Sequence, residues 1–167
     1  TIKFQWFGHI HLVSEKDLNK HKPTATLGVL PNTRTFTLKN FQKLFINRNA
    51  RIKNFLLDQK NIAGIGNVYV QDILFKAKLH PNRKISTLSE TEIKGLYKAI
   101  DELLNRAIQL GGLAYEKDFY GQEGKLTINS FLVGYKTGKP CPVCKTPIKK
   151  IKTGSTSSYI CSICQPL

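Results

Sequence analysis

Four cysteines in two matched pairs constrain this chain more than any other feature of its sequence. They occur as Cys141-Pro-Val-Cys144 and Cys161-Ser-Ile-Cys164, and 16 residues separate the two pairs. A two-residue gap lets one turn present two sulfurs to a single ion at about 2.3 Å, and this spacing is typical of a tetrahedral zinc site. The segment between the pairs is long enough for a β-hairpin that returns to the metal. The cysteines therefore predict a small β module folded around one Zn²⁺.

The four-cysteine set predicts a structural zinc, because it leaves no open coordination position for a substrate or a water molecule. Zinc replaces the hydrophobic core that so short a module cannot build. One alternative is a pair of disulfides, which the reducing cytosol disfavours. Another is a redox Cys-x-x-Cys motif, for which a single pair would suffice.

The charge of the chain indicates the chemistry of its partner. It has 26 Lys and Arg against 11 Asp and Glu, a formal net charge of +15, which four thiolates and one Zn²⁺ would lower to +13. Such a balance favours a polyanion, either nucleic acid or an acidic membrane surface, over a generically soluble basic protein. No apolar run approaches the roughly 20 residues that span a bilayer, and no signal peptide is recognisable. We therefore predict a cytoplasmic protein with no membrane partner.

The sequence from Thr37 to Pro81 contains patterns typical of helices. Apolar residues at helical spacing predict one helix from Thr37 and a second over residues 51–59. The two glycines of Gly64-Ile-Gly-Asn67 suit a tight turn, since each glycine inside a helix costs about 1 kcal/mol relative to alanine. Asn67 is a good N-cap for a third helix, which His80-Pro81 would end.

The clearest helix follows Ser89. Ser89 and Glu92 have capping-box spacing, an apolar stripe runs on to Ile108, and the pair Gly111-Gly112 stops the pattern. From Lys125 to the last residue the chain has seven lysines and no Asp or Glu. We place a domain boundary near residue 130, which gives a strand and linker segment (1–36), a helical domain (37–130) and a zinc finger (131–167).

The N-terminal segment has strand character. Ile2, Phe4 and Trp6 alternate with polar residues over 1–13, whereas Pro23 and Pro31 predict a loop over 14–36. The chain contains no Met. We therefore expect the chain to be a processed or excised fragment of a longer protein.

The order of these motifs is similar to a known family. Gly64-Ile-Gly-Asn-Val-Tyr69, Gln71-Asp-Ile-Leu-Phe75 and His80-Pro81, followed by Gly138-Lys-Pro-Cys-Pro-Val-Cys144 and Tyr159-Ile-Cys161, resemble the formamidopyrimidine-DNA glycosylase/endonuclease VIII family. The resemblance runs from about residue 4 to 165 and covers only the C-terminal part of a family member. It implies a mainly α fold with a helix–two-turn–helix bundle, a four-Cys β-hairpin zinc ribbon and short β-strand remnants at the N-terminus.

The resemblance implies base excision repair of oxidised bases by a bifunctional DNA glycosylase and AP lyase. In the family an N-terminal proline amine attacks C1′ of a flipped nucleotide, and an adjacent glutamate serves in acid/base steps. Thr1 and Ile2 match neither residue, so we assign no catalytic residue and predict that this chain is inactive by itself. The implied partner is double-stranded damaged DNA, and we expect a bacterial, nucleoid-associated monomer.

Two residues outside the finger take a role from the resemblance. Asn67 matches the family's phosphate-binding asparagine, and an Asn beside backbone N–H groups at a helix N-terminus also makes an anion site on physical grounds. Lys53 matches a family lysine that contacts a phosphate near the lesion. The alternatives are a plain N-cap for Asn67 and a solvated helix lysine for Lys53. The four cysteines match the family's zinc ligands.

The chain departs from the 8-oxoguanine type of the family. Lys3-Phe-Gln-Trp-Phe-Gly8 stands where those members have Asp-Pro-Arg-Arg-Phe-Gly, so Phe7 is either an aromatic wedge between bases or a core residue. Thr156 occupies about the place of a hairpin arginine that clamps two phosphates. Lys149, Lys150 and Lys152 would supply charge there, but as point charges without a bidentate fork.

Two other classes of protein fit the same motifs. One is a non-enzymatic zinc-ribbon nucleic-acid-binding protein, associated with the ribosome or with tRNA. The other is a zinc-ribbon adaptor between proteins. The combination of the glycine turn and the finger favours the repair protein over both.

Overall fold

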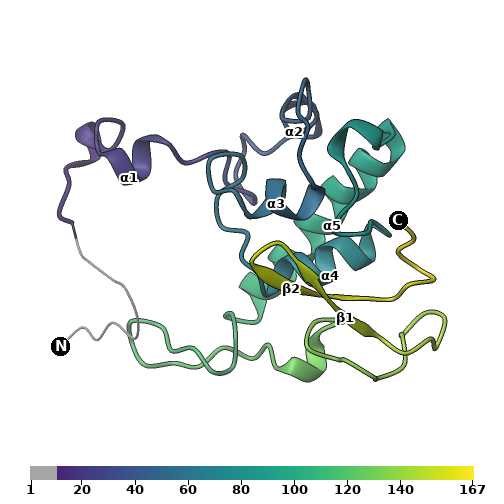
Figure 1. The fold of residues 1–167 in the computed structure, drawn as a ribbon. Helices are drawn as coiled ribbons and strands as arrows, with labels where there is room; N and C mark the ends of the chain where they lie inside the picture. The colour runs from purple at the N-terminus through teal and green to yellow at the C-terminus, as the bar shows by residue number, and fades with distance from the viewer. Residues whose placement is uncertain (1–10) are drawn as a thin grey trace.

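A computed structural model describes residues 11–167 of the chain (Figure 1). The strand expected over residues 1–13 therefore lies almost wholly outside the described residues, and residues 11–13 have no regular structure. The expectation for Phe7 lies outside them too. The described elements are helices α1 (Lys22–Ala25), α2 (Leu38–Lys43), α3 (Ile52–Leu57), α4 (Tyr69–Lys76) and α5 (Glu90–Gln109), strands β1 (Lys149–Thr153) and β2 (Thr156–Ile160), and 3₁₀ turns at Glu15–Asp17, Ile85–Thr87 and Ile128–Ser130.

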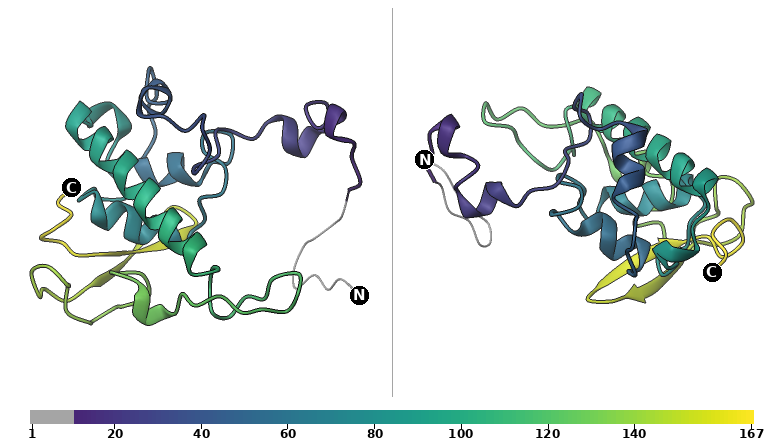
Figure 2. Two further views of the ribbon diagram at one scale, coloured as in Figure 1. Left: turned by 180° about the vertical axis from the view of Figure 1, so that it is seen from behind. Right: turned by 90° about the horizontal axis from the view of Figure 1, so that it is seen from above.

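Helix α5 is the longest element and crosses the whole helical body, as the view from behind shows (Figure 2). It packs against α4 and α2. The core between them is apolar and fully buried, because each amphipathic helix turns its apolar stripe inward. Its members include Phe41, Ile52, Leu56, Ile73, Leu96 and Ile100. The predicted mainly α fold with a small β zinc finger is confirmed.

The starts of the helices follow the sequence signals where those signals are local. The hydroxyl of Thr37 accepts a hydrogen bond from the Asn40 N–H at 3.2 Å and caps α2. Ser89 and Glu92 form the expected capping box at the start of α5. The second predicted helix is shorter than expected, because Asp58 has extended backbone and its carboxylate accepts the Lys60 N–H at 3.0 Å. Such side-chain bonds compete with helix continuation.

Pro23 does not break the structure of its segment as predicted. It lies in the first turn of the four-residue helix α1, where proline is tolerated because its missing N–H would have no helical partner. The predicted loop over 14–36 therefore contains two short helical turns, one of them the 3₁₀ turn at Glu15–Asp17.

The end of α4 differs from the prediction. The helix ends at Lys76, before His80-Pro81 is reached, because Lys78 adopts a left-handed backbone with φ 57°. The Leu79 N–H donates to the Leu74 carbonyl at 2.9 Å and the Lys78 N–H donates to the Phe75 carbonyl at 3.0 Å. These two bonds form a Schellman motif, which usually has glycine at the left-handed position. Gly111, with φ 69°, occupies that position at the end of α5.

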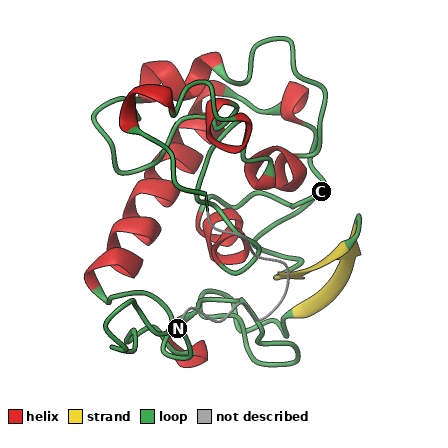
Figure 3. Cartoon of the chain, turned by 90° about the vertical axis from the view of Figure 1, so that its left-hand side faces the viewer, coloured by secondary structure: helices red, strands yellow, loops and turns green. Residues whose placement is uncertain are grey.

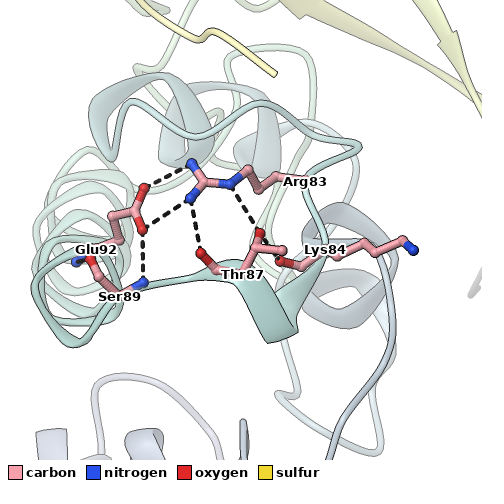
Figure 4. Close-up of polar contacts among 5 residues, drawn as sticks. All are labelled: Arg83, Lys84, Thr87, Ser89 and Glu92. Atoms are coloured by element: carbon pink, nitrogen blue, oxygen red, sulfur yellow. Dashed lines mark hydrogen bonds and ion pairs between the residues drawn. The ribbon is translucent and has the colours of Figure 1, made fainter.

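The loop between α4 and α5 is fixed by one arginine (Figure 4). The Arg83 guanidinium donates to both carboxylate oxygens of Glu92, at 2.8 and 3.3 Å, and to the Thr87 carbonyl and hydroxyl at 3.0 and 3.1 Å. Burial raises the pKa of Glu92, but hydrogen bonds from Ser89 and Arg83 outweigh it, and the pKa is lowered overall. The network therefore holds an ionised Glu92 and anchors this loop to α5.

Strands β1 and β2 form an antiparallel hairpin in which Lys149 pairs with Ile160 and Thr153 with Thr156. The hairpin lies on the opposite side of the molecule from α5 (Figure 3), and β2 contacts α4. A second core joins the two parts, with Phe75 of α4 packed among Val133, Cys141, Ile148 and Cys161. Within residues 11–167, every helix is too short or too polar to cross a bilayer.

Candidate zinc centre and nucleic-acid interface

The four cysteines converge at the base of the hairpin. Their sulfurs all lie within 4.8 Å of one another, and the Cys144 Sγ is 3.3 Å from that of Cys161 and 3.6 Å from that of Cys164. A tetrahedral Zn²⁺ with bonds of about 2.3 Å spaces its sulfurs by about 3.8 Å, whereas a disulfide requires about 2.05 Å. All four are free thiols. The residues therefore fit one structural zinc ion, as expected, and not two disulfides.

Hydrogen bonds and burial shift the pKa values of the thiols at this centre in opposite directions. The hydroxyl and backbone N–H of Thr146 lower the pKa of the Cys144 thiol to about 6. Burial raises the pKa of the Cys164 thiol to about 12. Sulfurs this close cannot all ionise together unless a positive ion balances them, which a tetrahedral Zn²⁺ does.

Lys53 on α3 is 1% exposed, so it is not a solvated helix lysine. Its ammonium donates to the hydroxyls of Thr153 and Thr156 at 3.0 and 2.9 Å and to the Ser157 carbonyl at 2.7 Å. Every proton of the ammonium thus has a partner on the finger hairpin. Loss of solvent lowers the pKa of Lys53 to about 8. Lys53 therefore joins α3 to the hairpin, and its contact with a phosphate remains a prediction.

Asn67 lies in the glycine turn before α4. The expectation that it is the N-cap is wrong, because Val68 occupies the cap position and no side chain caps the helix. Instead the Asn67 side-chain oxygen accepts a hydrogen bond from the Gln71 amide at 3.2 Å. The turn itself is present as expected, with Gly64 at φ 90° and its N–H donating to Gln59 Oε1 at 2.8 Å. Asn67 is thereby held at the positive end of the α4 dipole.

Two of the predicted site residues, Lys53 and Asn67, are linked through one carbonyl group of the finger, Asn67 by way of Gln71. Ser157 O accepts from Lys53 Nζ at 2.7 Å and from Gln71 Nε2 at 3.3 Å, while Gln71 also binds Asn67. Lys152 is paired with Ser157 across the hairpin. Its side chain is exposed, as are those of Lys149 and Lys150. The fold thus gathers Lys53, the Asn67 turn and three exposed lysines around β1 and β2.

A comparison with protein-family models identifies the helical part. Residues 27–118 match the model described as the formamidopyrimidine-DNA glycosylase H2TH domain. The chain belongs to this family. Residues 138–167 match a second model, a zinc finger found in FPG and IleRS. The family and the finger type expected from the motifs are both confirmed, whereas the domain boundaries at 36 and 130 remain predictions.

Curated relatives of this family member are formamidopyrimidine-DNA glycosylases. The protein from Pelotomaculum thermopropionicum is 42% identical over 161 residues, which are 95% of this chain and 58% of the relative. The protein from Listeria innocua is 36% identical over 161 residues, again 95% of this chain, and 59% of the relative. The chain thus spans somewhat less than three fifths of the length of these relatives.

Solved structures of the family show the same fold. A complex between Lactococcus lactis Fpg and DNA containing an abasic site matches with a TM-score of 0.83 and 33% identity, covering 93% of this chain and 57% of that one. The MutM (Fpg) protein of Thermus thermophilus matches with a TM-score of 0.79 and 32% identity, covering 89% and 57%.

Three polar residues of this family member were missed as candidates by sequence analysis. Gln71 and Asp72 lie on α4, and Gln165 follows the last cysteine; all three are at most 4% exposed. The Asp72 carboxylate accepts the N–H groups of Leu132, Val133 and Gly134 at 2.5, 2.9 and 3.0 Å. Gln165 Nε2 donates to the Leu79 carbonyl at 2.9 Å. For Gln71 and Asp72, the signal available in the sequence was two adjacent polar residues within an otherwise apolar helical stretch.

Proposed function

We propose that these 167 residues are the DNA-binding part of a bifunctional DNA glycosylase and AP lyase that acts in base excision repair of oxidised bases. One observation carries the proposal: the Asn67 turn and the lysine-bearing hairpin are joined through Gln71 and the Ser157 carbonyl. The solved structures of similar fold include Fpg in complexes with DNA that contains an abasic site or Fapy-dG. The partner we propose is accordingly damaged double-stranded DNA.

Binding would rest on two groups of positive charge. The N–H groups at the start of α4, beside Asn67, suit a phosphate because the helix dipole is positive there. Lys149, Lys150 and Lys152 are exposed on β1 and neutralise further phosphates as point charges. Lys53 supports both groups by holding the hairpin in place, and its own contact with a phosphate would require exchange of one of its three bonds. Phe7 is proposed as a wedge between bases.

We further propose that these residues bind DNA without cleaving it. None of the seven prolines is followed by glutamate, so the family's proline–glutamate pair does not occur in them. The net charge of +15 opposes self-association, in line with a monomer at the nucleoid in the bacterial cytoplasm.

The test is DNA binding by fluorescence anisotropy over a range of salt concentrations. We expect tighter binding to a duplex with an abasic-site analogue than to an intact duplex or a structured RNA. The logarithm of affinity should fall steeply with the logarithm of salt, by about 0.9 for each phosphate neutralised. Asn67→Ala should weaken duplex binding without loss of fold, whereas Asn129→Ala, at an exposed site beside the finger, should not.

Two outcomes would redirect the proposal. A preference for the structured RNA would favour a ribosome- or tRNA-associated zinc-ribbon protein. Binding to neither nucleic acid, or binding insensitive to salt, would favour an adaptor between proteins. Strand cleavage at the abasic site by the purified chain would contradict the proposed lack of lyase activity.

A further inference from the structure

Gln71 is a buried polar side chain between helix α4 and the finger hairpin, and it is only 2% exposed. A buried amide must satisfy both its oxygen and its NH₂ group within the protein, because water does not reach it. The groups around Gln71 therefore reveal which way its amide is oriented.

Two backbone groups of β2 fix the orientation of the Gln71 amide. The Tyr159 N–H can only donate, and it donates to Gln71 Oε1 at 3.2 Å. The Ser157 carbonyl can only accept, and it accepts from Gln71 Nε2 at 3.3 Å. The opposite orientation would bring two donors together at Tyr159 and two acceptors together at Ser157. The NH₂ group of Gln71 is thus the end of the amide that faces the Ser157 carbonyl and the Asn67 turn.

The oriented Gln71 amide in turn orients Asn67. Gln71 Nε2 also donates to the backbone carbonyl of Asn67 at 2.9 Å and to its side-chain Oδ1 at 3.2 Å. The oxygen and the nitrogen of an asparagine amide lie on either side of the same carbon, so an Oδ1 held by Gln71 leaves Nδ2 turned away from it. Within residues 11–167, Asn67 Nδ2 donates to no acceptor of the protein.

The NH₂ group of Asn67 lies where an anion is stabilised. Asn67 is half-buried and comes two residues before Tyr69, the first residue of α4, at the positive end of the helix dipole. An NH₂ group donates to a phosphate oxygen, whereas an amide oxygen turned the same way would repel it. The orientation of the Asn67 amide therefore decides whether this turn attracts or repels a phosphate.

We propose that Gln71 is a positioning residue for phosphate binding, which holds the Asn67 side chain with its NH₂ group toward the DNA backbone. The inference rests on the proposed function, because the phosphate is the one that the Asn67 turn would bind. It also makes the finger hairpin part of the site, since Ser157 and Tyr159 fix the Gln71 amide. Lys53 Nζ, 2.7 Å from the Ser157 carbonyl oxygen, keeps that acceptor in place.

The test is a double-mutant cycle that measures affinity for a duplex with an abasic-site analogue. Gln71→Met keeps the approximate length of the side chain and its lack of charge, but removes both ends of the amide. This variant should bind the duplex about tenfold more weakly, as expected when a hydrogen bond to a charged group is lost. In a chain that already carries Asn67→Ala, adding Gln71→Met should change the affinity by less than about twofold.

Gln165→Met is the matched control for a purely structural effect. Gln165 is 1% exposed and also joins the helical body to the finger, through the Leu79 carbonyl at 2.9 Å and the Cys161 N–H at 3.2 Å. Within the described residues it has no hydrogen bond to Asn67. Any loss of affinity in Gln165→Met should therefore be the same whether residue 67 is Asn or Ala. The same independence for Gln71→Met would overturn the positioning role.

Nuclear magnetic resonance of the Asn67 side chain gives a second readout. In a chain with isotope-labelled asparagine, the Asn67 Nδ2 protons should shift when the abasic duplex is added. Gln71→Met should lose most of this shift and Gln165→Met should keep it. A shift that is absent in the bound unaltered chain, or that is unchanged in Gln71→Met, would contradict the inference and leave DNA binding in place. If the unaltered chain did not bind the duplex, the proposed function would fail and this inference with it.

Discussion

Lys53 carries a positive charge into the contact between α3 and the zinc finger. Within residues 11–167 its ammonium donates to two hydroxyls and one carbonyl, and to no carboxylate. Hydrogen bonds to neutral acceptors offset only part of the cost of removing an ammonium group from water. This imbalance lowers the pKa of Lys53 from the ordinary 10.5 to about 8.

The lowered pKa predicts how stability depends on pH. Between pH 8 and 10.5 the folded chain has released the Lys53 proton while the unfolded chain still holds it, so the free energy of unfolding should rise with pH. The rise should be on the order of 2 kcal/mol, at about 1.4 kcal/mol for each pKa unit. Urea unfolding at pH 7.5 and 10 measures it. Lys53→Met should lack this increase in stability, whereas Lys98→Met, at an exposed site on α5, should keep it. Parallel pH profiles of stability for the unaltered chain and both variants would disprove the prediction.

Asp72 is the second residue whose role depends on distant partners. Its carboxylate accepts three backbone N–H groups from residues 132–134, which lead into the finger. Asp72→Asn replaces one acceptor oxygen by an NH₂ group that faces a backbone N–H. We expect a loss of about 2 kcal/mol in the free energy of unfolding. Asp101→Asn on the exposed face of α5 should cost less than about 0.5 kcal/mol, and equal losses in the two variants would refute the role of Asp72.

At the scale of elements, helix ends show where local chemistry decides the structure and where it does not. Gly111 and the Ser89 capping box act through groups within a few residues of each other, so α5 begins and ends where its sequence indicates. The Schellman motif at Lys78 has no glycine. Leu74 and Leu79 are both buried in the main apolar core, and their burial offsets the unfavourable left-handed backbone of Lys78.

We predict that removing the side chain at position 78 relieves this backbone strain at the end of α4. Lys78→Gly should raise the free energy of unfolding by up to about 1 kcal/mol, because glycine adopts positive φ without a Cβ clash. Lys98→Gly, within α5, should lower it by about 1 kcal/mol. Thermal unfolding of both variants compares the two sites. A destabilised Lys78→Gly chain would mean that the side chain of Lys78 contributes more than its backbone strain costs.

At the scale of the whole molecule, the finger and the helical body share a core and several hydrogen bonds. Phe75 of α4 packs in the same core as Cys141 and Cys161, and the side chains of Lys53, Gln71 and Asp72 all have partners in residues 132–159. A metal ion that folds the finger therefore also positions the partners of the helical residues.

Removal of zinc tests this coupling. A chelator at neutral pH should unfold residues 131–167 and also increase hydrogen exchange in α3 and α4, since buried polar groups there lose their partners. Helix α5 packs on the other side of α4 and should keep its protection. Mass spectrometry of exchange reports each segment. Exchange in α4 that is unaffected by the chelator would mean that the finger is an independent module, and loss of the finger with reductant alone would point to disulfides.

The sequence by itself determined the features that depend on spacing along the chain. The capping box of α5 and the glycine turn each depend on groups at most a few residues apart. The zinc ligands are two pairs of cysteines with the same close spacing. The chemistry of all three features is therefore visible in the order of residues. Tertiary structure alone decided that Lys53 is buried, that Asn67 binds Gln71 and does not cap α4, and that Asp72 holds the entry to the finger. The partners of Lys53 and Asp72 lie 60 or more residues away. Burial and such distant contacts arise only when the finger closes on the helices, because desolvation depends on what covers a side chain and not on its neighbours in sequence.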